Sequence, residues 1–238
     1  YASNFAVANE HSQENIFTIP MDKTLYANSF KNLFRTLHYI HGGALARGAE
    51  NGSSATRTTL AAFGYSTPAQ DPRFALNFFA DTVKVDGRTL KQADGEALVY
   101  HPEAIRLQLT GSKYEKTAGA RMYKYEIDRT AYDDGKLQNN DIVLYRYADA
   151  LLMRAEAQIR QGASGDAALN AVRARVGLPA ISGATLEDVL KERLLELVWE
   201  GTRRQDLVRF HRFHLPYEER PQLEKEANAY TTVFPIPA

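Results

Sequence analysis

KERLLELVWEGTRRQDLVRF, residues 191–210, carries nine ionisable side chains among leucines, valines, a tryptophan and a phenylalanine. A solvated helix needs fewer aliphatic residues than this, and an ordinary core helix needs fewer charges. Glu192, Glu196 and Glu200 recur every four residues, so a helix places them along one stripe. The stretch therefore raises the question of whether its acids are catalytic or structural.

Two interpretations of this acidic stripe follow from its chemistry. A glycosidase needs two carboxyl groups about 5–10 Å apart across a sugar, and helical spacing can meet that distance. Catalytic acids usually project from loops or strand ends into a cleft, whereas this stripe borders Leu197, Val198 and Trp199. We favour the second interpretation, in which partly buried arginine–carboxylate pairs hold helices in register. Trp199 is then expected to be a core residue in the middle of a helix.

The residues before this stretch predict a helical hairpin. Apolar residues recur with the helical period over 143–159, and Gly162 ends that helix. After a short ASGD link, a second helix runs through 168–176 and stops at Gly177 and Pro179. The two helices form an antiparallel pair of roughly tetratricopeptide proportions, with no second copy at a fixed period.

The helix that contains the acidic stripe has a clear predicted start. Thr185 is a good N-cap, and Asp188 stands three residues later, as in a capping box. Gly201 is a stop or a kink before the last helical segment.

The first half of the chain is weakly periodic and predicts a loop-rich region. NIFTIP (15–20) alternates apolar and polar residues and ends at proline, which is typical of a short edge strand. The sequence also predicts a helix over 22–40, a loop over 41–57, a turn before an aromatic segment over 67–79, a hairpin at Asp86 and Gly87, and a strand over 119–128. The predicted fold class is mainly α, with the helical hairpin packed against an irregular region and a few short strands.

The composition argues against several classes of function. The 29 acidic and 29 basic residues are interspersed and give a formal net charge of zero, so nothing favours a nucleic-acid partner. The chain contains no cysteine, which excludes disulfides, thiolate metal sites and cysteine nucleophiles within it. No run approaches the roughly 20 apolar residues that span a bilayer. P-loop, dinucleotide-binding and nucleophile-elbow motifs are also absent, so we expect no cofactor and no catalytic residue.

Two His-x-x-His pairs, at 38–41 and 211–214, have a spacing that can bind zinc on a helix. Neither has a nearby carboxylate at the spacing of zinc hydrolases. His41 and His214 also lie near expected helix ends, where histidine is favoured for electrostatic reasons. We therefore predict no metal site.

Aromatic residues make up 11% of the chain, and tyrosine is the commonest of them. The flat face of a tyrosine or tryptophan can pack on the C–H face of a sugar ring, and the tyrosine hydroxyl can bond to sugar oxygens. Side chains in or beside irregular segments are the better candidates for a surface site. The candidate ligand-binding residues are Tyr26, Tyr39, Arg47 and Tyr65.

The second half of the chain resembles a known family. The matching blocks are VLYRYADALLMRAEAQIRQG (143–162), ALNAVRARVGLP (168–179), LEDVLKERLLELVWEGTRRQDLVRF (186–210) and a late FPIPA (234–238). Their order and spacing resemble the SusD/RagB family of outer-membrane nutrient-binding lipoproteins. IFTIP (16–20) and DPRF (71–74) are weaker matches to the same family.

The resemblance implies a function and a location. Members of this family are mostly helical binding proteins rather than enzymes. A lipidated cysteine anchors them on the surface of certain Gram-negative bacteria, where they hand oligosaccharides, polysaccharides or, in some members, peptides to a partner TonB-dependent, SusC-like transporter. For this chain, the resemblance implies glycan binding at the outer membrane, with the lipid anchor outside the present sequence.

The resemblance also implies how the chain is organised. It would be the C-terminal part of a longer protein, with an irregular region over 1–140, a helical signature region over 141–210 and a C-terminal extension over 211–238. The family has no fixed set of binding residues, so none is carried over to this chain.

The charged residues of the matching blocks are expected to form a structural framework of ion pairs. This framework consists of Arg146, Glu156, Arg173, Arg175, Glu192, Arg193, Glu196, Glu200 and Asp206. Two other functions stay open beside glycan binding. One is a helical scaffold that mainly contacts the transporter, and the other, the least favoured, is a carboxylate-dependent hydrolase.

Overall fold

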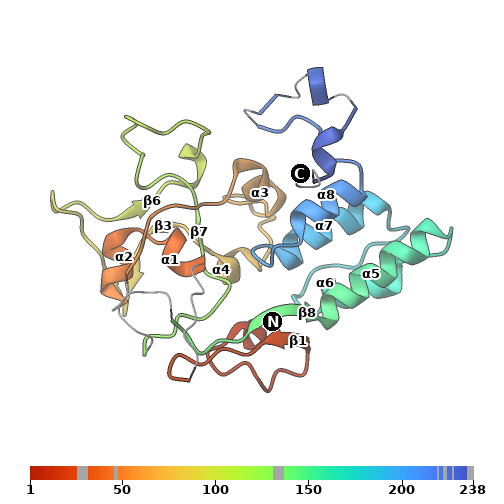
Figure 1. Ribbon diagram of the computed structural model, residues 1–238, viewed down its shortest axis with the longest axis horizontal. Coiled ribbons are helices and arrows are strands. Elements are labelled where there is room, and N and C mark those ends of the chain that lie inside the picture. The colour runs from red at the N-terminus through yellow and green to blue at the C-terminus, as the bar shows by residue number, and fades with distance from the viewer. Residues whose placement is uncertain are drawn as a thin grey trace.

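The computed structural model describes residues 1–25, 32–45, 48–130, 137–218, 220–221, 224–226 and 228–234. Helices α5 to α8 gather on one side of the molecule, and short helices, short strands and loops occupy the other (Figure 1). The predicted class, mainly α with a loop-rich region and short strands, is confirmed. Within the described residues, the helices are too short or too polar to cross a membrane.

Four helices form the helical region: α5 (Tyr147–Arg160), α6 (Asp166–Ala174), α7 (Leu186–Leu197) and α8 (Arg203–Arg209). Helices α5 and α6 form the predicted hairpin, and α7 packs against both. Their apolar faces meet in a core that includes Leu152, Leu169, Val172 and Val189. Burying each such side chain stabilises the fold by about 1.5–3 kcal/mol. This core fixes how α5 and α7 are rotated, and therefore where their charged residues point.

The segment before α5 is a strand rather than the start of the helix. The prediction that the helix includes Val143 and Leu144 is wrong, because Ile142–Arg146 form strand β8, which pairs antiparallel with β1 (Asn15–Ile19). A short apolar run satisfies the helical and the strand period equally well, and here the distant pairing partner decides between them. The edge strand predicted at 15–20 is confirmed as β1.

Helix α7 begins at the predicted capping box. The hydroxyl of Thr185 accepts a hydrogen bond from the Asp188 amide at 3.3 Å, and the Asp188 carboxylate accepts one from the Thr185 amide at 2.8 Å. Two donors that a helix start leaves open are thereby satisfied. The capping-box prediction is confirmed.

Helix α7 ends earlier than predicted, so Trp199 is not in the middle of a helix. The backbone of Trp199 has φ +68° and that of Gly201 has φ +79°, and these left-handed residues turn the chain before α8. The Trp199 ring nevertheless packs inward, 5.8 Å from the Phe78 ring, and its Nε1 donates to the Asn77 carbonyl at 3.0 Å. The expected core packing of this tryptophan is therefore found on a link between helices.

The loop-rich region contains short elements. Its helices are α1 (Asn32–Thr36), α2 (Tyr39–Ala44), α3 (Arg57–Ala62) and α4 (Phe74–Asn77). Its antiparallel strand pairs are β2 (Phe78–Phe79) with β7 (Arg121–Met122), β3 (Asp81–Thr82) with β6 (Val99–Tyr100), and β4 (Lys84–Val85) with β5 (Arg88–Thr89). Single 3₁₀ turns span Ala2–Phe5, Pro102–Ala104, Glu224–Glu226 and Tyr230–Thr232.

The long helix predicted over 22–40 is wrong. Residues 22–25 are not helical, and residues 26–31 lie outside the described part of the chain. Between α1 and α2, the extended backbone of His38 starts a new helix, and its ring accepts a hydrogen bond from the Ile40 amide at 3.2 Å. The chain continues as α2 to Ala44, so the loop predicted from residue 41 begins later than expected.

Two strand predictions have different outcomes. The hairpin at Asp86 and Gly87 is confirmed, with φ of +50° and +76° in the two-residue turn between β4 and β5. The strand predicted over 119–128 is confirmed only for Arg121–Met122, where β2 supplies a partner.

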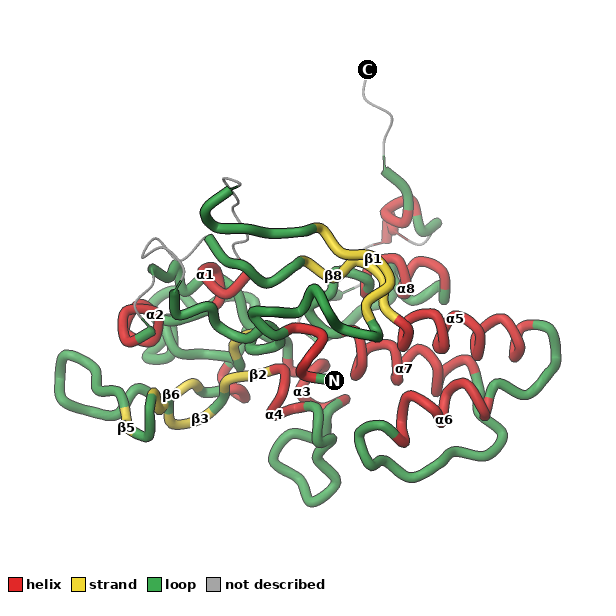
Figure 2. Tube along the Cα trace, turned by 90° about the horizontal axis from the view of Figure 1, so that it is seen from below, coloured by secondary structure: helices red, strands yellow, loops and turns green. Residues whose placement is uncertain are grey.

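An aromatic core joins the loop-rich region to α7. The rings of Phe63, Phe74 and Phe78 lie 5.1, 5.2 and 6.2 Å apart, and Leu195 of α7 packs against them. Figure 2 shows α3 and α4 between the helical end of the molecule and the short strands. Because Leu195 precedes Glu196 directly, the same packing directs the acidic stripe of α7 into the interior.

Candidate functional site

The predicted acidic stripe lies in a buried charge network, with Glu192 and Glu196 on α7 and Glu200, contrary to the prediction, in the turn after that helix. Arg73 Nη1 donates to Glu192 Oε1 at 2.6 Å and to Glu196 Oε2 at 2.9 Å. Arg146 Nη1 donates to Glu196 Oε1 at 2.6 Å, and its Nε donates to Glu200 Oε2 at 2.8 Å. The side chains of Arg73, Arg146 and Glu196 are 0% exposed, so these are interior ion pairs.

This network is balanced in charge. Its five cations are Arg73, Lys124, Arg146, Arg173 and Arg175, and its five carboxylates are Glu14, Asp71, Glu192, Glu196 and Glu200. Burying a charge is costly unless it is paired and hydrogen-bonded. The equal numbers of the two signs allow ten ionised groups to share one interior region.

A second network ties α5, α7 and α8 together. Arg193 Nη1 donates to Asp149 at 2.8 Å, and its Nε donates to Asp206 at 2.7 Å. Arg209 donates to both oxygens of Glu156, at 2.9 and 3.2 Å, and to Asp206 at 2.9 Å. The nine residues predicted as a framework therefore all occur in one or the other of these two networks.

The stripe acids have the wrong environment for general acid catalysis. Burial alone would raise the pKa of Glu196, but the guanidinium groups of Arg146, Arg175 and Arg73 outweigh it and lower the pKa to about 2. A general acid needs a raised pKa and access to the substrate. Both oxygens of each stripe carboxylate already accept from a cation. The arrangement fits internal ties between segments.

Several members of the networks have no signal in the local sequence. Asp71 and Arg73 lie in the DPRF block, whose role in the framework is not apparent from its spacing. Lys124 pairs with Glu200, and Glu14 pairs with Arg146 and Arg175, across long stretches of chain. These pairs arise only when the folded segments meet, so no periodic pattern marks them.

The predicted ligand-binding residues do not form one cluster. Tyr26 and Arg47 lie outside the described residues. Tyr39 is 53% exposed at the start of α2, with its ring 5.6 Å from that of His38. Tyr65 lines a pocket that does not include Tyr39.

We call the pocket of about 440 Å³ beside β3 and β6 the Tyr65 pocket. It is lined chiefly by Tyr65, Asp81, His101, Glu103, Arg106 and Tyr114. Tyr65 Oη donates to Asp81 Oδ1 at 2.7 Å, and burial together with this bond raises the pKa of the phenol. The His101 and Tyr114 rings stand 4.5 Å apart, and Lys113 Nζ lies 4.7 Å from the Tyr114 centroid. Half-buried aromatic rings surrounded by polar groups of both signs are suited to a polyhydroxylated ligand.

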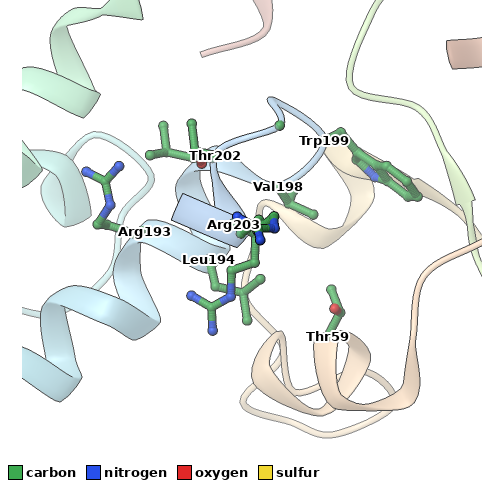
Figure 3. Close-up of a pocket in the computed structure, with 10 residues that line it drawn as sticks. Thr59, Arg193, Leu194, Val198, Trp199, Thr202 and Arg203 are labelled. Atoms are coloured by element: carbon green, nitrogen blue, oxygen red, sulfur yellow. The ribbon is translucent and has the colours of Figure 1, made fainter. Parts of the chain in front are cut away.

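A second cavity, of about 350 Å³, lies between α3 and the junction of α7 and α8. We call it the Arg203 pocket. Figure 3 shows Thr59 on one side and Leu194, Val198 and Arg203 on the other, with Trp199 at one end. Its walls are mainly aliphatic and aromatic, with arginine and threonine side chains among them.

The histidine pair at 38–41 is engaged in local structure. The His38 ring caps α2, and His41 Nδ1 lies 3.0 Å from the Tyr100 hydroxyl. Burial lowers the pKa of His41 to about 4, so this ring is neutral near pH 7. Across the described ranges, no group of three or more histidine, aspartate or glutamate side chains has the arrangement of a metal site.

The sequence comparisons identify relatives of this chain. The model of the SusD family matches residues 13–235. The starch-binding protein SusD of Bacteroides thetaiotaomicron is 36% identical over 90 residues, which are 37% of this chain and 16% of that protein.

Solved structures share the fold. A SusD-like protein from Bacteroides fragilis has a TM-score of 0.63 and 21% identity over 89% of this chain and 46% of its own. Surface glycan-binding protein A from Bacteroides thetaiotaomicron, in complex with laminarihexaose, has a TM-score of 0.60 and 21% identity over 98% of this chain and 53% of its own. The chain therefore spans about half the length of these structures. Because the family model covers most of the sequence, and the fold agrees with it, the chain belongs to the SusD family.

Proposed function

We propose that this chain binds an oligosaccharide or polysaccharide in the Tyr65 pocket and does not turn it over. The observation that carries the proposal is the pair of accessible tyrosines, Tyr65 and Tyr114, in a pocket that also offers Asp81, Glu103 and Arg106. Aromatic faces bind the apolar side of a sugar, and the surrounding polar groups bond to its hydroxyls. A relative with the same fold that carries laminarihexaose supports this ligand class.

The environment of the acids supports a binding role over hydrolysis. The neighbouring arginines lower the pKa of Glu196 and occupy both of its oxygens, while Asp81 accepts a hydrogen bond from the Tyr65 hydroxyl. Turnover of a glycan that is lost in Glu192→Gln or Glu196→Gln, with the fold retained, would restore the hydrolase interpretation.

Family membership supports a cellular location for this binding. We propose that the protein acts on the cell surface of a Gram-negative bacterium, held at the outer membrane by a lipid anchor outside this sequence. It would pass its ligand to a TonB-dependent, SusC-like transporter. The same pathway would carry peptides if a peptide, rather than a glycan, occupies the Tyr65 pocket.

Replacing Tyr114 with alanine is expected to weaken oligosaccharide binding about tenfold, because a stacking face is lost. Isothermal titration with laminarihexaose, together with α- and β-linked glucose oligomers of equal length, measures the effect. Tyr39→Ala is the matched control, since it removes an exposed tyrosine outside the pocket. Equal losses of affinity in the two variants would show that the Tyr65 pocket is not the binding site. Binding of peptides, with no binding of oligosaccharides, would show that the ligand is a peptide.

One surface favours the second candidate, a scaffold that contacts the transporter. The β1–β8 ribbon exposes Ile16, Phe17, Leu144 and Tyr145 at 62, 56, 43 and 56%. The Phe17 and Tyr145 rings stack at 6.5 Å on adjacent strands. Exposed apolar side chains in contact, as Phe17 and Tyr145 are, are typical of protein-binding surfaces.

Changing both Phe17 and Tyr145 to serine is expected to reduce recovery of the transporter with the protein, because the apolar contact area is lost. Affinity purification from outer membranes measures this, with Tyr114→Ala as the control that leaves the ribbon intact. If the ribbon variant retains the transporter and its fold, the scaffold role of this surface is wrong.

A further inference from the structure

The Arg203 pocket contains two arginines that differ from those of the buried networks. Arg203 Nη1 donates to the Leu190 carbonyl at 3.0 Å, and Arg204 Nη2 donates to the Thr231 carbonyl at 3.1 Å. Within the described part of the chain, neither forms an ion pair with a carboxylate. Arg193, which also lines the pocket, is already neutralised by Asp149 and Asp206.

The positive charge of Arg203 is poorly compensated where it lies. Burial and the repulsion of Arg193 lower the pKa of Arg203, and the attraction of Asp206 does not offset this. Glu218 is held at the start of α3, where its carboxylate accepts from the Thr58 amide at 2.5 Å, and it is not among the residues that line the pocket. An added anion at Arg203 would supply the missing compensation, because charge-assisted hydrogen bonds strengthen as water is excluded.

Arg204 is positioned by aromatic contacts rather than by a carboxylate. Its guanidinium lies 4.6 Å from the Phe213 ring and 4.2 Å from the Phe234 ring. Stacking of this kind fixes the plane of the guanidinium while leaving N–H groups at its edge for another acceptor. The pocket is therefore lined by two arginines from consecutive positions of α8, both lacking an acidic partner.

The other walls are suited to a sugar ring. Leu194, Val198 and Trp199 form an apolar surface, and the Trp199 N–H is already bonded to Asn77, so the indole offers only its ring. Thr59 and Thr202 add hydroxyl groups at the sides of the pocket (Figure 3). Its volume of about 350 Å³ falls within the range of small-molecule sites.

We propose that the Arg203 pocket binds a carboxylated sugar, a uronic-acid residue of a glycan, with its carboxylate at Arg203 and Arg204 and its ring against Leu194, Val198 and Trp199. The ligand class rests on the proposed glycan-binding function, but the site is separate from the Tyr65 pocket. The Tyr65 pocket has charges of both signs, whereas the charged side chains that line the Arg203 pocket are all arginines, two of them without a carboxylate partner among the described residues. The two sites together would select an acidic glycan over a neutral one.

Titration of the full chain with trimers of galacturonic, glucuronic and mannuronic acid, each beside its methyl ester, tests this proposal. At least one free acid is expected to bind about tenfold more tightly than its ester, since only the acid gains charged hydrogen bonds. Equal affinity of acid and ester, or absence of binding by all three acids, would overturn the proposal.

Four variants locate the effect in this pocket. Arg203→Gln and Arg204→Gln are each expected to remove most of the preference for the acid, whereas Arg154→Gln, at an exposed site on α5, leaves it unchanged. Thr59→Glu keeps both arginines and places a competing carboxylate across the pocket. Position 59 is only partly buried on α3, and glutamate is a good helix former, so this variant is expected to fold.

The outcomes separate this proposal from the proposed function. If laminarihexaose binding depends on Tyr114 but the acid preference is missing, the Tyr65 pocket stands and the Arg203 pocket fails. If the acid preference depends on Arg203 while Tyr114→Ala has no effect on the binding of any glycan, the Arg203 pocket stands and the Tyr65 pocket fails. Loss of the preference in Arg154→Gln as well would show a general effect of charge and overturn the assignment to this pocket.

Discussion

Arg146→Leu is expected to lower the free energy of unfolding by about 3–5 kcal/mol, one of the largest effects of any single substitution in this chain. Arg146 is 0% exposed and donates to Glu14, Glu196 and Glu200. Its removal leaves an excess of buried negative charge, and the remaining cations cannot move to cover it without breaking their own pairs. The loss is therefore the cost of uncompensated charge rather than of one hydrogen bond.

Urea unfolding followed by circular dichroism measures this difference. Arg154→Leu is the matched control, because it removes an exposed arginine from α5 and is expected to change stability by less than about 0.5 kcal/mol. Arg146→Lys, which keeps the charge but loses the planar fork, is expected to fall between wild type and Arg146→Leu. A change below about 1 kcal/mol in Arg146→Leu would show that the network contributes little to stability.

Acid is expected to unfold the protein over the range from about pH 5 to pH 2, as stability falls steadily with pH. Burial alone would raise the pKa values of Glu14, Glu196 and Glu200, but the neighbouring arginines and Lys124 outweigh it and lower all three. The folded protein thus binds fewer protons than the unfolded chain in this range. The stabilising contribution is complete above the unfolded pKa and is lost as pH falls through the folded pKa, which for Glu196 is about 2.

For Glu196 alone, a shift from 4.5 to about 2 corresponds to roughly 3 kcal/mol. Urea unfolding at pH 7, 5, 4 and 3 measures the slope, and Glu196→Gln is expected to flatten it even though this variant starts from a lower stability. Raising the salt concentration is expected to change the slope little, because interior pairs are poorly screened. A stability that stays constant from pH 5 to pH 3 would contradict the inferred ionisation of the network.

Local sequence patterns predict the helical region well. They fail where a segment distant in the sequence determines the secondary structure. Thr185 and Asp188 mark the start of α7 because a capping box needs only neighbouring residues. Strand β8 is misread as helix because its strand character depends on β1, far away in the sequence. Trp199 is misplaced because a positive φ at tryptophan is not signalled by the adjacent leucines.

The candidate sites follow the same rule. The nine framework residues are predictable from the blocks that carry them, but Arg73 and Lys124 come from other segments and are found only in the fold. Tyr65 is predictable as an aromatic beside an irregular segment, and it stays a proposed ligand contact. His101 and Tyr114, which complete its pocket, lie in loops that have no periodicity.

The balanced charge network also has a consequence for how the chain reaches its fold. Arg146 is the last residue of β8, and strand residues alternate between the two faces of a ribbon. A slip of one residue in the pairing of β1 with β8 would turn Arg146 outward and remove from the interior the cation that Glu196 and Glu200 share. A misaligned chain that closed its core would therefore bury uncompensated negative charge, so the network favours the native alignment of the two strands.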